Sequence, residues 1–156
     1  MDLSNRRVTH ADFELLQRKL GPAYALNSAD SRTPHVVVAL PSYSVSESLL
    51  SHYVSRLAPL EHRFLVSIFL LRIPSARLVY ICSAEPATEV VYSYLSLLPE
   101  SLNASERFRL VVVDDRTARP VAEKLLDRPD LIGSITEWIG EDPGFIEPWN
   151  VTRAEQ

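Results

Sequence analysis

Short apolar runs alternate with helix-like patterns along this chain of 156 residues, and the alternation constrains the fold more than any other feature. The most apolar run, residues 110–113 (LVVV), has no polar face, which is typical of a strand covered by helices on both sides. Helical connections between strands favour a parallel sheet with right-handed crossovers. The sequence therefore predicts a three-layer α/β domain with a mainly parallel four-stranded sheet and helices on both faces. The strands are expected at residues 35–40, 77–83, 110–113 (the central strand) and 145–151, the last near an edge because it contains Pro148.

The first 33 residues are expected to form an N-terminal helix and loop, separate from a domain over residues 34–156. Thr9 and Asp12 have the spacing of a helix N-cap followed by an acid three residues later. Gly21 and Pro22 are expected to end this helix, and residues 27–34 read as a loop. The helix is predicted to dock through one apolar face, formed by Phe13, Leu16 and Leu20.

Proline marks several of the other predicted helices. Pro59 suits the first turn of a helix over residues 60–72, which is apolar nearly all round and should be deeply buried. A helix over residues 88–98 is expected to bury one face, and residues 100–106 read as a polar loop. The last helical region is expected to be interrupted at Pro129.

Polar residues follow the predicted strands, where parallel sheets gather their ligands. A sheet order of 2-1-3-4 would place Ser42 and Asp114 opposite each other across a crevice. The acids Asp114 and Asp115 suit a metal, a ribose or a substrate amine, or else one of them caps the following helix. The serines either contact a ligand or bond to their own turns. The candidate substrate-binding residues are Ser42, Ser83, Asp114, Asp115 and Arg119.

Composition excludes several classes of protein. The net charge of −4 gives no electrostatic reason to expect nucleic acid or an anionic membrane as a partner. The longest apolar stretch is too short to span a bilayer, and the N-terminus lacks the apolar core of a signal peptide, so a cytoplasmic location is expected. Cys82 is the only cysteine, and the four histidines have no metal-binding spacing, so no metal site is predicted. Only two of the sixteen basic residues are lysines, Lys19 and Lys124, which we attribute to genome composition.

The glycines exclude the common phosphate-binding loops. The chain has four, none of them clustered, so backbone amides cannot close on a phosphate as they do in a P-loop or a dinucleotide fingerprint. No serine lies in a G-x-S-x-G elbow, which leaves an α/β-hydrolase unsupported. No cofactor is therefore expected in this chain, and in any ATP-dependent reaction the phosphates would have to be bound elsewhere.

Several segments taken together resemble one family. They are LVYICSAEP (78–86), VVYSYLSLLP (90–99), LVVVDDRTARPVAEKLLDRP (110–129) and FIEPWNVTRAE (145–155). They are similar to the N-terminal pre-ATP-grasp domain of pheganomycin-type peptide ligases, which are ATP-grasp carboxylate–amine ligases. The most specific parts are the D-D-x-x-x-R-P motif at residues 114–120 and the L-L-x-R-P motif at residues 125–129. The resemblance implies a Rossmann-like domain over residues 34–156.

The resemblance also implies a division of labour. Enzymes of this family activate a carboxylate as an acyl phosphate with ATP and Mg²⁺, and an amine then attacks. The ATP-grasp domains that bind ATP follow the pre-ATP-grasp domain, and in this sequence they would be expected to begin near Gln156. The chain by itself is then a scaffold and possible substrate-pocket domain without a catalytic residue, and its partners are ATP-grasp domains in cis or in another subunit.

A second hypothesis belongs to a different class. The chain would be a stand-alone Rossmann-like binding or protein-interaction module that pairs with a separate subunit or forms a homodimer. Trp149 and the N-terminal helix are the candidate contacts.

Overall fold

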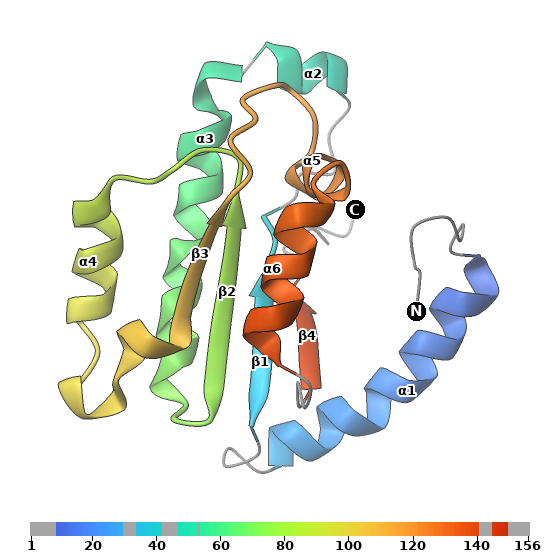
Figure 1. The fold of residues 1–156 in the computed structure, drawn as a ribbon, viewed down its shortest axis with the longest axis vertical. Coiled ribbons are helices and arrows are strands. Elements are labelled where there is room, and N and C mark those ends of the chain that lie inside the picture. The colour runs from blue at the N-terminus through green and yellow to red at the C-terminus, as the bar shows by residue number, and fades with distance from the viewer. Residues whose placement is uncertain (1–8, 30–33, 42–46, 53, 141–144, 150–156) are drawn as a thin grey trace.

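The computed structural model describes residues 9–29, 34–41, 47–52, 54–140 and 145–149, and it has an α/β fold. The strands are all parallel and lie in the order β3-β2-β1-β4 (Figure 1). They are β1 (His35–Ala39), β2 (Ala76–Cys82), β3 (Phe108–Val112) and β4 (Phe145–Trp149). The predicted α/β class and the parallel pairing are confirmed, and β4 lies at an edge as Pro148 indicated.

The strand order differs from the expected 2-1-3-4 in a way that matters for the site. β2, not the run at residues 110–113, is the inner strand with the most complete burial, whereas β3 is an edge strand with one buried residue among its five. Four apolar residues in a row fit either place, because helices cover both faces of an edge strand as well. The reversal of strand order lies between β1 and β4, so β1 and β3 are not neighbours and the crevice expected between their ends is not formed.

Helices pack on both faces of the sheet, in two separate apolar clusters. One cluster joins β1, β2 and β3 to η1 (Arg63–Arg72) and α4 (Thr88–Ser96). The other joins the opposite face of the same strands to α5 (Val121–Leu126) and α6 (Pro129–Ile139), and Figure 1 shows α6 crossing in front of the sheet. The remaining short elements are α2 (Glu47–Ser51), α3 (Val54–His62), η2 (Glu100–Leu102) and η3 (Ala104–Arg107). The last two occupy the segment predicted as a loop.

The segment predicted as an α-helix over residues 60–72 is divided. Pro59 lies inside α3, and the ten residues that follow form the 3₁₀ helix η1. A 3₁₀ helix has three residues per turn, and burial here follows that period. The row against the sheet is 0% exposed (Leu65, Ile68, Leu71). The outward row begins and ends in arginine (Arg63, Val66, Phe69, Arg72). The apolar content predicted a buried helix but did not distinguish an α-helix from the 3₁₀ form.

The N-terminal helix is longer than predicted. The cap is confirmed, since the Asp12 amide donates to Thr9 Oγ1 at 3.2 Å and Asp12 Oδ2 accepts from the Thr9 amide at 3.0 Å. However, α1 spans His10–Ala29, so Gly21 and Pro22 do not end it and the loop cannot begin at residue 27. Its contacts with β4 illustrate how tertiary context outweighs a local helix breaker. On its predicted apolar face, Phe13 and Leu16 stay 50% and 52% exposed.

Arginine side chains donate hydrogen bonds to backbone carbonyls at the ends of several helices and strands. Arg107 donates five hydrogen bonds to four backbone carbonyls, those of Leu71, Ile73, Ala76 and Leu102. Arg77 donates to the carbonyls of Trp138 and Ile139 at the end of α6, and its guanidinium lies 3.9 Å from the centre of the Trp138 ring. A planar guanidinium reaches several acceptors at once, which an ammonium group cannot do. At these positions arginine therefore has a structural role beyond genome composition.

Candidate functional site

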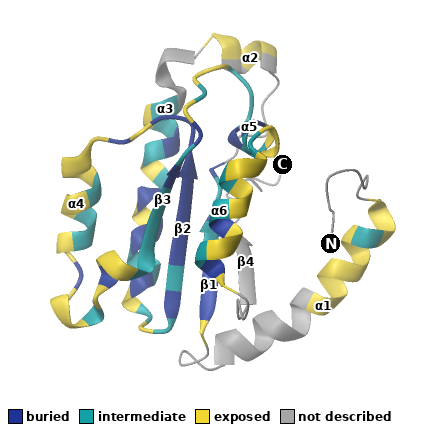
Figure 2. Cartoon of the chain, in the orientation of Figure 1, coloured by how far each residue is buried: buried dark blue, intermediate teal, exposed yellow. Residues whose placement is uncertain are grey.

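Among the described residues, buried polar side chains are concentrated at the carboxyl ends of β2 and β3. Figure 2 shows the carboxyl end of β2 in the buried colour. Ser83 directly follows β2, and Asp115 lies three residues after β3. Pairing continues beyond both strands, because the Asp115 amide donates to the Ser83 carbonyl at 3.1 Å. The two turns are thus held side by side by their backbones before any side chain is considered.

A buried network of Glu61, Ser83 and Lys124 fills the space beneath these turns. Glu61 Oε2 accepts from the Ser83 amide at 2.6 Å, and Oε1 accepts from the Ser83 hydroxyl at 2.7 Å. Lys124 Nζ then donates to Ser83 Oγ at 2.9 Å and to the Asp115 carbonyl at 2.9 Å. The three side chains are only 2–3% exposed. Four separate segments, from α3, β2, the turn after β3 and α5, are therefore joined at one point.

Burial and charge act in opposite directions within this network. Loss of water lowers the pKa of the Lys124 ammonium, while the Glu61 and Asp115 carboxylates favour its charged form. Burial, with a smaller contribution from the Glu61 charge, raises the pKa of the neighbouring Cys82 thiol to about 12. Cys82 is therefore a packing residue and not a nucleophile at neutral pH.

The end of α3 is tied to β2 by two further contacts. The Tyr80 hydroxyl donates to the backbone carbonyl of Glu61, and His62 Nε2 lies 2.9 Å from the Ala84 carbonyl. These contacts set the direction from which the Glu61 carboxylate reaches Ser83. Polar groups that would be costly to bury alone are satisfied here by one another.

Above the network, the turn at residues 113–120 has an ordered set of polar contacts. Asp115 Oδ1 accepts from the Thr117 amide at 2.8 Å. Burial raises the pKa of Asp115, but this bond and the nearby Lys124 and Arg119 outweigh it, so the pKa lies below its usual value. Asp114 is exposed and has a left-handed backbone, with φ of 58°.

Arg119 and Arg128, the arginines of the two motifs, form ion pairs with acidic side chains, and Arg128 also bonds to the backbone at the end of β3. Arg119 pairs with Asp127 at 2.8 Å and with Glu123 at 3.7 Å. Arg128 donates to the Val113 carbonyl at 2.9 Å and pairs with Asp130 at 2.7 Å. Both motifs thus hold the turn after β3 against α5 and the start of α6.

The structure places the predicted site residues in different environments. Ser83 and Asp115 are brought together through Lys124, Arg119 lies on the α5 side of the same turn, and Asp114 faces solvent. Ser42 lies outside the described residues. Two of the alternatives are wrong. α5 begins at Val121 after its N-cap residue Pro120 and has no side-chain cap bond, so neither acid caps it, and the Ser83 hydroxyl bonds to Glu61 instead of to its own turn.

Sequence reasoning missed Glu61 and Lys124, which contribute the two charges of the network. Glu61 opens a long apolar segment, and nothing in the local pattern distinguishes it from a surface acid. Lys124 did carry a signal, because it is one of two lysines in a chain that otherwise uses arginine. A compact ammonium fits a buried site where a guanidinium would not.

Glu61, Ser83 and Lys124 bond to one another in a closed, buried network, which we call the clamp. The Ser83 hydroxyl both donates and accepts within it, and its burial leaves no face for a substrate. Within the described residues, no group of three or more acidic, histidine or cysteine side chains is arranged to hold a metal ion. Nor is any described helix long and apolar enough to cross a membrane. Of the predicted site residues that the structure describes, Ser83 is buried, Asp115 and Arg119 are half-buried, and Asp114 is exposed.

Comparison of the chain with protein-family models, with curated proteins and with solved structures finds no match. The interpretation of this site accordingly depends on its own chemistry and on the motifs.

Proposed function

We propose that this chain is the pre-ATP-grasp domain of an ATP-dependent carboxylate–amine (peptide) ligase-like protein. In this role it is a Rossmann-like scaffold that forms one wall of a substrate pocket and has no ATP site of its own. The order β3-β2-β1-β4 supports the Rossmann-like classification, because it equals the first four positions of the doubly wound order 3-2-1-4-5-6.

One observation carries the proposal: the residues of the two motifs are bonded to one another and to the buried clamp. Asp115 and Lys124 meet directly, Arg119 binds Asp127, and Arg128 binds the end of β3. These groups are used to hold the carboxyl edge rigid, which is what a scaffold wall requires. In this proposal the phosphates of ATP are bound, together with Mg²⁺, by ATP-grasp domains in cis or in a partner subunit.

Within this proposal the candidate substrate residues divide into two roles. Asp114, exposed at the tip of the turn, and Arg119 beside it are the groups that would face a substrate. Ser83 and Asp115 would position that turn from below through Lys124. The left-handed backbone of Asp114 supports the assignment, since non-glycine residues in this conformation are concentrated at functional turns.

The test combines a calorimetric titration of the chain with the sequence of the surrounding gene. Calorimetry of this chain with Mg-ATP should give no tight binding, and tight binding would contradict the proposal. The reading frame beyond the codon for Gln156, or a neighbouring gene, should encode ATP-grasp domains with a glycine-rich loop and late magnesium-binding acids. If neither does, the domain is not part of a ligase.

A stand-alone interaction module is the second candidate, favoured by the half-exposed Phe13 and Leu16 on α1. An apolar helix face of this kind is a common protein contact. Light scattering of the chain over a range of concentrations tests this candidate. Association that is lost in the double variant Phe13→Ser/Leu16→Ser would support an interaction module. A chain that is monomeric at all concentrations would weaken the module hypothesis.

A further inference from the structure

The side of the molecule formed by α4 and the following turns exposes apolar side chains that the described part of the fold does not cover. Tyr92 and Leu97 are 71% and 69% exposed, and no residue of α4 itself is buried. Figure 2 shows this helix mostly in the exposed colour, at the margin next to the edge strand β3. Exposed aromatic and aliphatic residues that adjoin a groove typically mark a protein contact.

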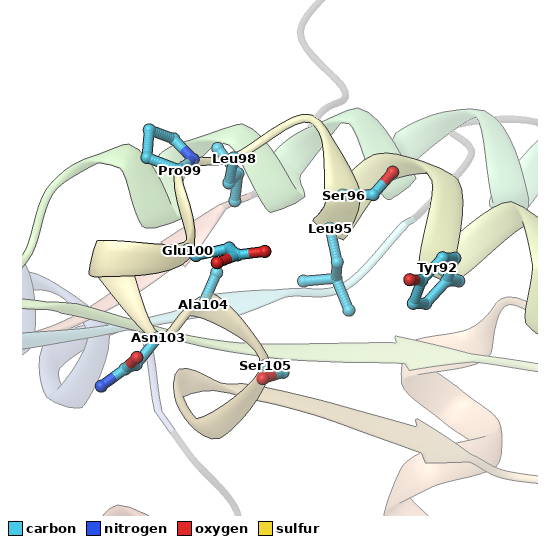
Figure 3. A pocket seen from close by; sticks show the side chains of 9 residues that line it. All are labelled: Tyr92, Leu95, Ser96, Leu98, Pro99, Glu100, Asn103, Ala104 and Ser105. Carbon is cyan, nitrogen blue, oxygen red and sulfur yellow. The ribbon is translucent and has the colours of Figure 1, made fainter.

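A first groove, of about 320 Å³, lies between α4, η2 and η3. Its lining combines apolar and polar side chains, and Glu100 is the only charged residue among the described residues that line it. Figure 3 shows the Glu100 carboxylate pointing toward the side of the groove where Leu95 and Tyr92 lie. The groove therefore presents a negative charge and a phenol beside apolar side chains, which suits a cationic side chain.

A second groove, of about 500 Å³, lies on the other side of the same turn and shares Leu98 and Pro99 with the first. Arg72, the last residue of the outward row of η1, is the only charge on its described lining, and Leu97 contributes apolar surface. Neither Arg72 nor Glu100 has an ion pair or a side-chain hydrogen bond with any residue that the structure describes. Two opposite charges without a described partner thus flank one apolar ridge.

We propose that this surface is a two-fold contact between two copies of the chain. In such a contact residue i meets residue j of the other copy and j meets i, so one surface must carry both members of each pair. The exposed ridge formed by Leu97 and Pro99 would lie on the axis, with Arg72 of each copy opposite Glu100 of the other. Tyr92 and Leu97 provide the apolar area. The contact leaves the carboxyl edge free and is independent of the ligase proposal.

The test uses the full chain and two charge reversals. The wild type should form a dimer whose population rises with concentration in analytical ultracentrifugation. Arg72→Glu alone and Glu100→Arg alone should each weaken it at least about tenfold, because like charges then face each other twice. Leu97→Ser should weaken association to a similar extent without a change in thermal unfolding.

Mixing the two charge-reversed variants should restore the dimer. In the mixed pair the acid introduced at position 72 of one copy faces the arginine introduced at position 100 of the other. The native Glu100 of the first copy likewise faces the native Arg72 of the second, so both contacts join opposite charges again. A contact that does not pair these two positions would not recover in this way.

Matched controls lie outside both grooves, on η1 and on α4. Arg63→Glu on η1 and Glu89→Arg on α4 reverse exposed charges of the same sign and should leave the dimer unchanged. A wild-type monomer at every concentration up to the solubility limit would overturn the proposal. A dimer that tolerates both single reversals, or a mixture that fails to associate, would overturn it as well.

Discussion

Replacing Lys124 by methionine tests whether the carboxyl edge depends on the buried charge. Methionine fills most of the volume of the lysine stem, so the loss of the ammonium dominates over any cavity. The 3%-exposed Glu61 carboxylate would keep only its two bonds from Ser83, and the Asp115 carbonyl would lose a donor. Removing one member of a buried charge pair costs about 3–5 kcal/mol. We expect the lower end, about 3 kcal/mol, because Ser83 lies between the charges and partly compensates the carboxylate.

Urea unfolding followed by circular dichroism measures this cost. With a slope of about 2 kcal/mol per M, a loss of about 3 kcal/mol lowers the midpoint by about 1.5 M. Lys19→Met is the matched control, because Lys19 is the other lysine and is exposed, so its cost should stay within about 0.5 kcal/mol.

A double-mutant cycle separates the charge pairing from the hydrogen bonds. Glu61→Gln in the Lys124→Met background removes the second charge, so the double variant should be more stable than the sum of the single effects allows, by about 2 kcal/mol. Strictly additive costs, or a cost below about 1 kcal/mol for Lys124→Met, would refute a coupled buried pair.

Three further predictions concern single side chains. Arg107→Lys should cost about 2–4 kcal/mol, since an ammonium cannot replace five bonds to four carbonyls, whereas Arg116→Lys, at an exposed position, should cost almost nothing in the same thermal or urea unfolding assay. Ser67→Ala should raise the free energy of unfolding by about 1 kcal/mol, because the buried Ser67 hydroxyl has no partner among the described residues; a loss of stability would indicate one. Cys82, whose pKa burial raises to about 12, should react with a thiol reagent at pH 8 only after unfolding, and rapid labelling of the native protein would show that its strand opens locally.

Part of the site was predictable from local pattern. Ser83 and Asp115 stand directly after apolar runs, and the ends of parallel strands converge at one edge whatever the order of the strands. Their chemical partners were not predictable in this way. Glu61 and Lys124 lie 22 and 41 residues away from Ser83 in the chain, and only packing brings them to it. A serine that appeared available for a ligand is thereby engaged on both its donor and acceptor sides.

The sequence by itself determined the α/β class, the positions of the strands and the cap of α1, because each depends on side-chain period or on hydrogen bonds within a few residues. The strand order, the 3₁₀ form of η1 and the continuation of α1 through Pro22 were decided by the tertiary structure. Local patterns for the alternatives differ little in free energy, so contacts between distant segments select among them. The same holds for the clamp, where three polar side chains become one buried unit only after four separate segments have packed together.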